Sequence, residues 1–206
     1  MIMRNILILV CFGLLFSCKN DNQAGEAKPI NKILKTDMST PTDPAKLTIP
    51  SACEMITQEK LQAIMNTAGI SVRIKEANDP ANPKSKSCFF QWEDPNTPNA
   101  GILIQIQTNP VFEDYPQYIS NFVAAKLSEG ETVLGQDKAI KYKKFAVGET
   151  VGAFSHEQSR FYWSLGNDYL FMLALNLTSL NESKMLSIGE KIVAEINNNF
   201  ATKAAK

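Results

Sequence analysis

The chain is poor in histidine and carries no excess of either charge. Its 206 residues include one histidine, and 21 Lys and Arg residues balance 21 Asp and Glu residues. One histidine is too few for a histidine-based metal site or a multi-histidine proton relay, so we expect no metal and no cofactor. A formal charge of zero argues against a nucleic-acid partner, because such proteins bind phosphates through an excess of basic residues.

Recognisable catalytic motifs are also missing. The glycines are scattered rather than gathered in a phosphate-binding loop, and no Gly-x-Ser-x-Gly elbow is present. The one histidine, His156, lies between Ser155 and Glu157. Neighbours in a strand point to opposite faces, so these three residues cannot form a triad among themselves. We therefore expect a non-catalytic protein; the alternative is a hydrolase acting on envelope material, with distant side chains converging on His156.

The longest uncharged apolar run lies at the N-terminus, over residues 6–16. It is too short for a membrane-spanning helix, which needs about 20 residues, but it has the length of the apolar part of a secretory signal. The segment ends at Cys18, which directly follows Ser17 and lies three residues after Leu15. This order resembles a bacterial lipobox, and the resemblance implies cleavage before Cys18 and acylation of that cysteine. The alternative is an ordinary signal peptide or an uncleaved anchor with a chance cysteine.

The lipobox resemblance sets the expected organisation of the chain. We predict a signal peptide over 1–17, a lipidated flexible tether over 18–50, and a single domain over 51–206. The tether is assigned because its polar, Pro-containing composition cannot bury enough apolar surface to offset the entropy of ordering. Lys19, rather than an aspartate, follows Cys18, which is compatible with an outer-membrane lipoprotein. The expected location is the cell envelope, with the membrane contacted through the lipid; the periplasmic face and the cell surface both stay open.

Two cysteines remain for the domain, Cys53 and Cys88. In an exported, oxidising compartment, such a pair indicates one disulfide. The alternatives are a thiol redox pair and half of a metal site. The spacing is far wider than the Cys-x-x-Cys arrangement that lowers a thiol pKa, and histidine partners for zinc are lacking. We expect the disulfide.

Hydrophobic periodicity predicts an α+β domain. Helices are expected over about 57–68, 116–127 and from 179 or 181 to 200, and strands over 70–74, 87–92, 101–108, 138–147, 151–157, 160–165 and 169–177. The last strand is apolar on both faces, which is typical of a central strand covered on both sides. We therefore expect an antiparallel-dominated sheet with helices packed on one or both faces.

Aromatic residues are concentrated in the late predicted strands. We expect most of them in the core. A minority could instead line a groove that takes an apolar ligand or a partner segment. The candidates for that groove are Trp92, Phe161, Trp163 and Tyr169.

A second resemblance covers the domain. The segment 53–57 is similar to the Cys-x-Leu-Leu-Thr opening of small bacterial lipoproteins of unknown function, with Ile56 in place of a leucine, and the segment 88–92 is similar to their Cys-x-x-x-Trp strand. The resemblance implies an exported α+β domain of the PsbP-like or Mog1-like sandwich type, without an assigned chemistry. The expected function is therefore that of an envelope lipoprotein that binds a protein partner or a small ligand.

Overall fold

The computed structural model describes residues 40–133, 135, 138–177 and 180–204. Its described elements are, in chain order, η1 (Pro44–Lys46), η2 (Ala52–Glu54), α1 (Gln58–Met65), β1 (Val72–Glu76), β2 (Ser85–Trp92), β3 (Gly101–Gln107), α2 (Tyr118–Ser128), β4 (Lys143–Val147), β5 (Thr150–Ser155), β6 (Arg160–Leu165), β7 (Tyr169–Asn176) and α3 (Glu182–Ala204). The predicted signal peptide, the lipidation site Cys18 and most of the predicted tether lie outside the described residues.

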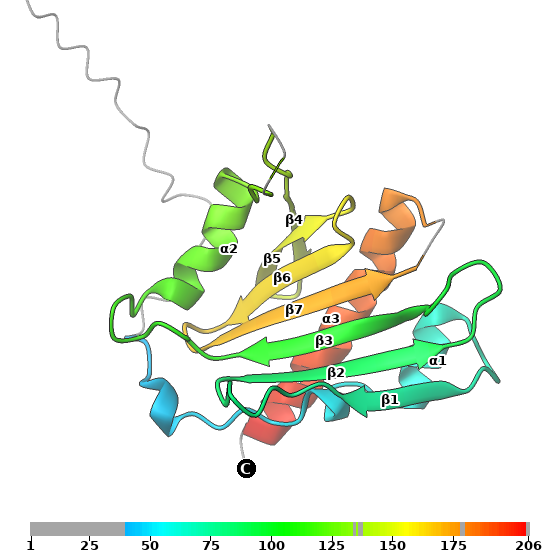
Figure 1. Ribbon diagram of the computed structural model, residues 1–206, viewed down its shortest axis with the longest axis horizontal. Coiled ribbons are helices and arrows are strands. Elements are labelled where there is room, and N and C mark those ends of the chain that lie inside the picture. Colours follow the sequence, from blue (N-terminus) through cyan, green and yellow to red (C-terminus); the bar gives the residue numbers. More distant parts are fainter. Residues whose placement is uncertain (1–39, 134, 136–137, 178–179, 205–206) are drawn as a thin grey trace, which may run out of the picture. The chain divides into compact units, whose positions relative to one another are not determined.

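The seven strands form one antiparallel sheet in the order β1-β2-β3-β7-β6-β5-β4. It consists of two meanders, β1 to β3 and β4 to β7, which join where β3 pairs with β7. The chain passes from one meander to the other through α2 (Figure 1). The predicted α+β class with an antiparallel sheet is confirmed, and the strand predicted as central, β7, lies in the middle of the order.

The helices α1 and α3 begin where the sequence provides a capping side chain. The Thr57 hydroxyl accepts a hydrogen bond from the Lys60 backbone N–H at 3.2 Å, and Asn181 caps α3 in the same way at 2.9 Å. The helix predicted over about 57–68 ends earlier than expected, at Met65, and Asn66 follows it with a φ of 55°. Asparagine tolerates the left-handed conformation that ends a helix, so no glycine is needed there.

The larger core lies on the face of the sheet that carries η2, α1 and α3. Side chains from alternate positions of all seven strands point to this face and meet apolar residues of α3 such as Ile192 and Ile196, which are fully buried. Trp163 and Phe171 stack here with their ring centroids 5.1 Å apart. In Figure 1, α3 crosses behind the sheet.

The smaller core lies on the opposite face, where α2 contacts β5 and β6. Ile119 and Val123 of α2 pack there against Ala153, Tyr162 and Leu170 of the sheet. Helices therefore cover both faces, but on this side α2 lies over β5, β6 and the first residues of β7. The β1–β3 half of this face is open in the described structure.

The predicted disulfide is present. Cys53 in η2 is bonded to Cys88 in β2, with 5.0 Å between their Cα atoms. The bond fastens the segment before α1 to the core side of β2, where Cys88 is fully buried.

Residues 42–50, which the sequence analysis assigned to the tether, lie against the domain; we call them the strap. The Thr42 backbone N–H and hydroxyl donate to the two carboxylate oxygens of Asp168, at 2.7 and 3.0 Å. The Tyr169 hydroxyl donates to the Thr48 carbonyl at 3.2 Å, and Ile49 packs on the larger core. These contacts order the segment in spite of its polar composition, because its few apolar residues find partners on the sheet.

Candidate functional site

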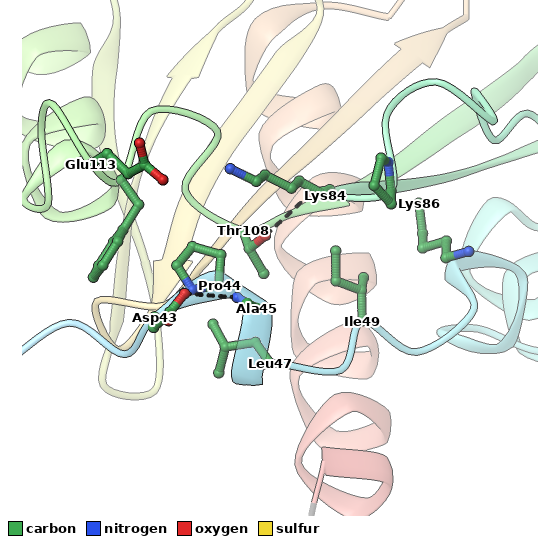
Figure 2. A pocket seen from close by; sticks show the side chains of 11 residues that line it. Asp43, Pro44, Ala45, Leu47, Ile49, Lys84, Lys86, Thr108 and Glu113 are labelled. Atoms are coloured by element: carbon green, nitrogen blue, oxygen red, sulfur yellow. Dashed lines mark hydrogen bonds between the residues drawn. The ribbon is translucent and has the colours of Figure 1, made fainter.

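A pocket of about 510 Å³ lies between the strap and the ends of β2 and β3. Figure 2 shows the strap residues along one wall and the strand ends along the other. The two walls come from parts of the chain that are well separated in sequence, so the pocket exists only in the folded domain.

The strap wall is largely apolar. Pro44 and Ala45 belong to η1, and Leu47 and Ile49 follow it with their side chains on the pocket. The Asp43 carboxylate caps η1 by accepting a hydrogen bond from the Ala45 backbone N–H at 2.9 Å. This bond uses one of the two acidic side chains of the pocket to hold the wall in place.

The sheet wall carries the basic side chains. The Lys84 carbonyl accepts hydrogen bonds from the backbone N–H and the hydroxyl of Thr108, at 3.0 and 3.5 Å, which fixes Lys84 at the rim. Its ammonium group donates to the Pro110 carbonyl at 3.3 Å. In Figure 2 the Lys84 side chain extends toward Glu113, whereas Lys86 points away from it.

This arrangement provides a mostly apolar space with one ammonium group and one carboxylate at its mouth. An ammonium group has three N–H donors, so Lys84 can bind an anionic or polar group while it keeps its bond to Pro110. Pockets that bind small molecules are typically apolar with a few polar groups that fix the orientation of the ligand. A small, largely apolar molecule with one polar end would match this lining.

The four aromatic residues proposed for a groove lie elsewhere, and none of them lines this pocket. Phe161 and Trp163 are fully buried in the larger core, and Trp92 is nearly so. The Trp163 indole N–H donates to Asn197 of α3 at 2.9 Å, which fixes that ring under the helix. Tyr169 is half-buried, packs on Phe200 and holds the strap. All four lie on the larger-core face of the sheet, but the strand register keeps Trp92 and Tyr169 at opposite ends of it, so the four do not form one groove.

His156 lies in the exposed turn between β5 and β6. Its Nε2 atom is 2.9 Å from the backbone carbonyl oxygen of Leu180. The described contact of this ring nitrogen is therefore to the main chain and not to the hydroxyl or carboxylate of a triad. It joins the turn to the segment before α3.

A polar cluster under α2 escaped the sequence analysis. The Lys126 ammonium is 2.7 Å from a Glu131 carboxylate oxygen, and the Tyr142 hydroxyl donates to the same oxygen at 2.6 Å. The ammonium also lies 5.3 Å from the ring centroids of Phe122, Tyr142 and Tyr162. Such distances allow cation–π attraction. The chain's own lysine fills the space between the rings, so the cluster fastens α2 to the sheet.

The cluster also shifts the ionisation of its members. Burial raises the pKa of the Tyr142 hydroxyl, and its hydrogen bond to the Glu131 carboxylate raises it further. Burial favours the neutral form of Glu131 as well, but the hydrogen bonds from Lys126 and Tyr142 outweigh this effect. They hold the pKa of Glu131 below its ordinary value of 4.5. At neutral pH the cluster therefore contains a carboxylate and an un-ionised phenol.

Sequence patterns contained a partial signal for the pocket. Asp43 before Pro44 is typical of a helical turn, and Leu47 and Ile49 alternate as in an extended segment that lies on a sheet. These signals would have placed the strap in the domain. Nothing in the sequence indicated that Lys84 and Thr108 would face it.

None of the described helices is both long and apolar enough to span a membrane. The chain matches no protein-family model, no curated protein and no solved structure. The functional argument therefore rests on the chain's own residues and geometry.

Proposed function

We propose that this protein is a lipid-anchored envelope protein without catalytic activity, which binds a small, largely apolar ligand between the strap and the sheet. The observation that carries the ligand-binding part is the pocket of about 510 Å³ with Lys84 at its mouth. The volume lies in the range of small-molecule sites, roughly 300–1,000 Å³.

The anchoring part of the proposal rests on the segment that ends at Cys18. The short apolar run, the small residue before the cysteine and the leucine three residues before it support acylation of Cys18. A lipid there would attach the domain to the envelope, with the outer membrane as the proposed location.

The first experiment uses a dye with an apolar body and one anionic group, 8-anilinonaphthalene-1-sulfonate. We expect saturable binding to the folded protein and a fluorescence increase, because the apolar wall shields the dye from water. The Leu47→Trp substitution should abolish this binding by filling the space. Ile74→Trp is the matched control, since Ile74 is 42% exposed on β1 and does not line the pocket. Unchanged dye affinity in Leu47→Trp would contradict the pocket as the site.

The second experiment tests the polar end of the ligand. Lys84→Gln should weaken binding of the sulfonate dye but leave binding of its uncharged relative, N-phenyl-1-naphthylamine, unchanged. The reason is that only the anionic dye gains from the ammonium group at the mouth. Equal loss of both dyes would show that Lys84 acts on the shape of the pocket rather than on ligand charge.

A further inference from the structure

The half of the sheet that α2 leaves open forms a defined surface. Figure 1 looks onto it: the strands β1, β2, β3 and β7 lie in front of α1 and α3. Phe89 points to this side, because it alternates with Cys88 and Phe90, which are buried in the core on the other side. Phe89 itself is 37% exposed. A single exposed phenylalanine is common on protein surfaces, so the side chains around it decide whether it belongs to an interaction surface.

One row of side chains crosses this surface from strand to strand. The strand pairings align Lys75 of β1 with Phe89, Phe89 with Leu103, Leu103 with Ala174, and Ala174 with Arg160 of β6. The middle of the row is apolar and each end is a cation. We call this row and its flanking positions on the same face the open face.

The strand positions of the open face carry basic residues and no acidic ones. Arg73 adds a third cation beside Lys75 and donates to the Gln91 side chain at 3.0 Å. On β3 and β7 the neighbouring positions are uncharged, with Gln105 next to Met172. At the α2 end of the row, Arg160 interacts with the Tyr162 hydroxyl and with Glu131, and the Glu131 carboxylate is itself paired with Lys126. The open face therefore attracts negative charge.

The α2 helix shows how a helix lies on this same side of the sheet. It covers β5 and β6 through Ile119, Phe122 and Val123, which pack against Tyr162. Neighbouring strands are about 4.8 Å apart and packed helices about 8–10 Å, so each helix occupies the width of about two strands. A second helix beside α2 would lie over β7, β3 and β2, on Ala174, Leu103 and Phe89.

We propose that the open face docks an amphipathic helix of a partner protein, with an apolar stripe flanked by Asp and Glu on both sides. The apolar stripe would cover Phe89 and Leu103, while the acidic flanks would meet Lys75 on one edge and Arg160 on the other. This proposal does not depend on the pocket or on its ligand.

Charge argues against two other occupants. The apolar cluster of the segment before the strap, Ile30, Ile33 and Leu34, is interspersed with lysines and would bring positive charge to a basic face. A second copy of the chain that docked through the same face would bring basic residues against basic residues, because the strand positions of this face carry no acidic ones. Both arrangements repel, so the face selects an acidic partner.

The test measures binding of a labelled helical peptide of about five turns to the full-length protein by fluorescence anisotropy. The peptide carries a leucine stripe flanked by glutamates, and a matched peptide carries lysines in their place. We expect the acidic peptide to bind, with an affinity that falls as the salt concentration rises. We expect the lysine peptide not to bind. Phe89→Ser and Lys75→Glu should each lower the affinity for the acidic peptide at least about tenfold.

Lys191→Glu is the matched charge control, because Lys191 is exposed on α3 behind the sheet; its affinity should stay within about twofold of the unsubstituted protein. Unfolding temperatures show whether each variant is folded, and Lys75 is exposed on an edge strand, where substitution leaves the core intact. The proposal is overturned if the two peptides bind equally, or if Phe89→Ser and Lys75→Glu both leave acidic-peptide affinity unchanged. It is also overturned if anionic lipid vesicles bind the open face and the acidic peptide does not.

Discussion

The disulfide between Cys53 and Cys88 is a covalent constraint on the fold. It joins η2 to the second strand across a loop of 35 residues. In the chain-entropy account, closing a loop of this length stabilises the folded state by about 4 kcal/mol, because the unfolded chain loses conformations.

Replacing both cysteines with alanine should therefore lower the free energy of unfolding by about 2–5 kcal/mol. Urea unfolding of the two proteins measures the difference. The mass of the unsubstituted protein should rise by two hydrogens on reduction. Two titratable thiols in a fragment of residues 40–206 purified under air would contradict the bond, because Cys53 and Cys88 are the only cysteines of that fragment.

The polar cluster under α2 makes a prediction about acid stability. The hydrogen bonds to Glu131 hold its pKa below 4.5, so ionised Glu131 favours the folded state at every pH above that value. This contribution is lost as the pH falls through the lowered pKa, because the unfolded chain then binds the proton more readily. Unfolding temperatures measured from pH 6 to pH 3 should therefore fall less steeply in Glu131→Gln than in the unsubstituted protein.

The control for this prediction is Glu190→Gln, a carboxylate of α3 on the other face of the sheet. It should keep the full acid dependence. A Glu131→Gln profile parallel to that of the unsubstituted protein would show that the carboxylate does not carry the effect.

At the scale of elements, α3 approaches the sheet closely at Gly189. A Cβ atom there would overlap the ring of Phe161. That ring cannot move aside, because it stacks on Phe154 at 4.4 Å between centroids and touches Phe145 at 5.4 Å. Alanine is normally the better helix former by about 1 kcal/mol, so the packing and the propensity oppose each other here.

We expect the packing to dominate, so Gly189→Ala should destabilise the protein by about 1–3 kcal/mol, measured by urea unfolding. Ser187→Ala, at an exposed position of the same helix, should be neutral or slightly stabilising. If Gly189→Ala stabilised the protein as well, α3 would have room at the sheet that the structure does not give it.

Much of the element structure could be predicted from the sequence. The helix predicted from residue 57 begins at Gln58, directly after its cap Thr57, and the double-sided apolar pattern of 169–177 identified the central strand. Both depend on local chemistry, on capping and on the alternation of side chains. The strap was missed because Leu47 and Ile49 are isolated apolar residues among prolines and polar residues. Ile49 becomes part of the core only through its contacts in the folded domain, and Leu47 lines the pocket.

The pocket and the open face were beyond prediction for a different reason. The pocket needs Lys84 opposite the strap, which requires the strand order and the path of the N-terminal segment. To predict the open face, one would have to know which strands α2 covers and which it leaves exposed. The groove predicted from the aromatic residues coincides with neither the pocket nor the open face, because a periodic pattern shows which face of a strand a residue is on but not what covers that face.

For the whole molecule, we predict that the proposed anchor determines whether the protein stays attached to a membrane. Cys18→Ala should lose stable membrane association, while the folded domain keeps its unfolding temperature, because the described contacts of the domain begin with the strap. Fatty-acid labelling and membrane fractionation measure the first effect, and thermal unfolding measures the second. Unsubstituted protein that takes up no label would contradict the lipoprotein proposal.

The pairing of β3 with β7 has a kinetic consequence. It closes the sheet between a strand that ends at Gln107 and one that begins at Tyr169, so the two meanders stay separate until β7 is in place. Contacts so distant along the chain form slowly, since the loop between them must close before the pairing gains energy. The N-terminal meander alone lacks both β7 and the apolar face of α3. The seven-stranded sheet can therefore be completed only after β7 has been synthesised, although β1, β2 and β3 are made long before it.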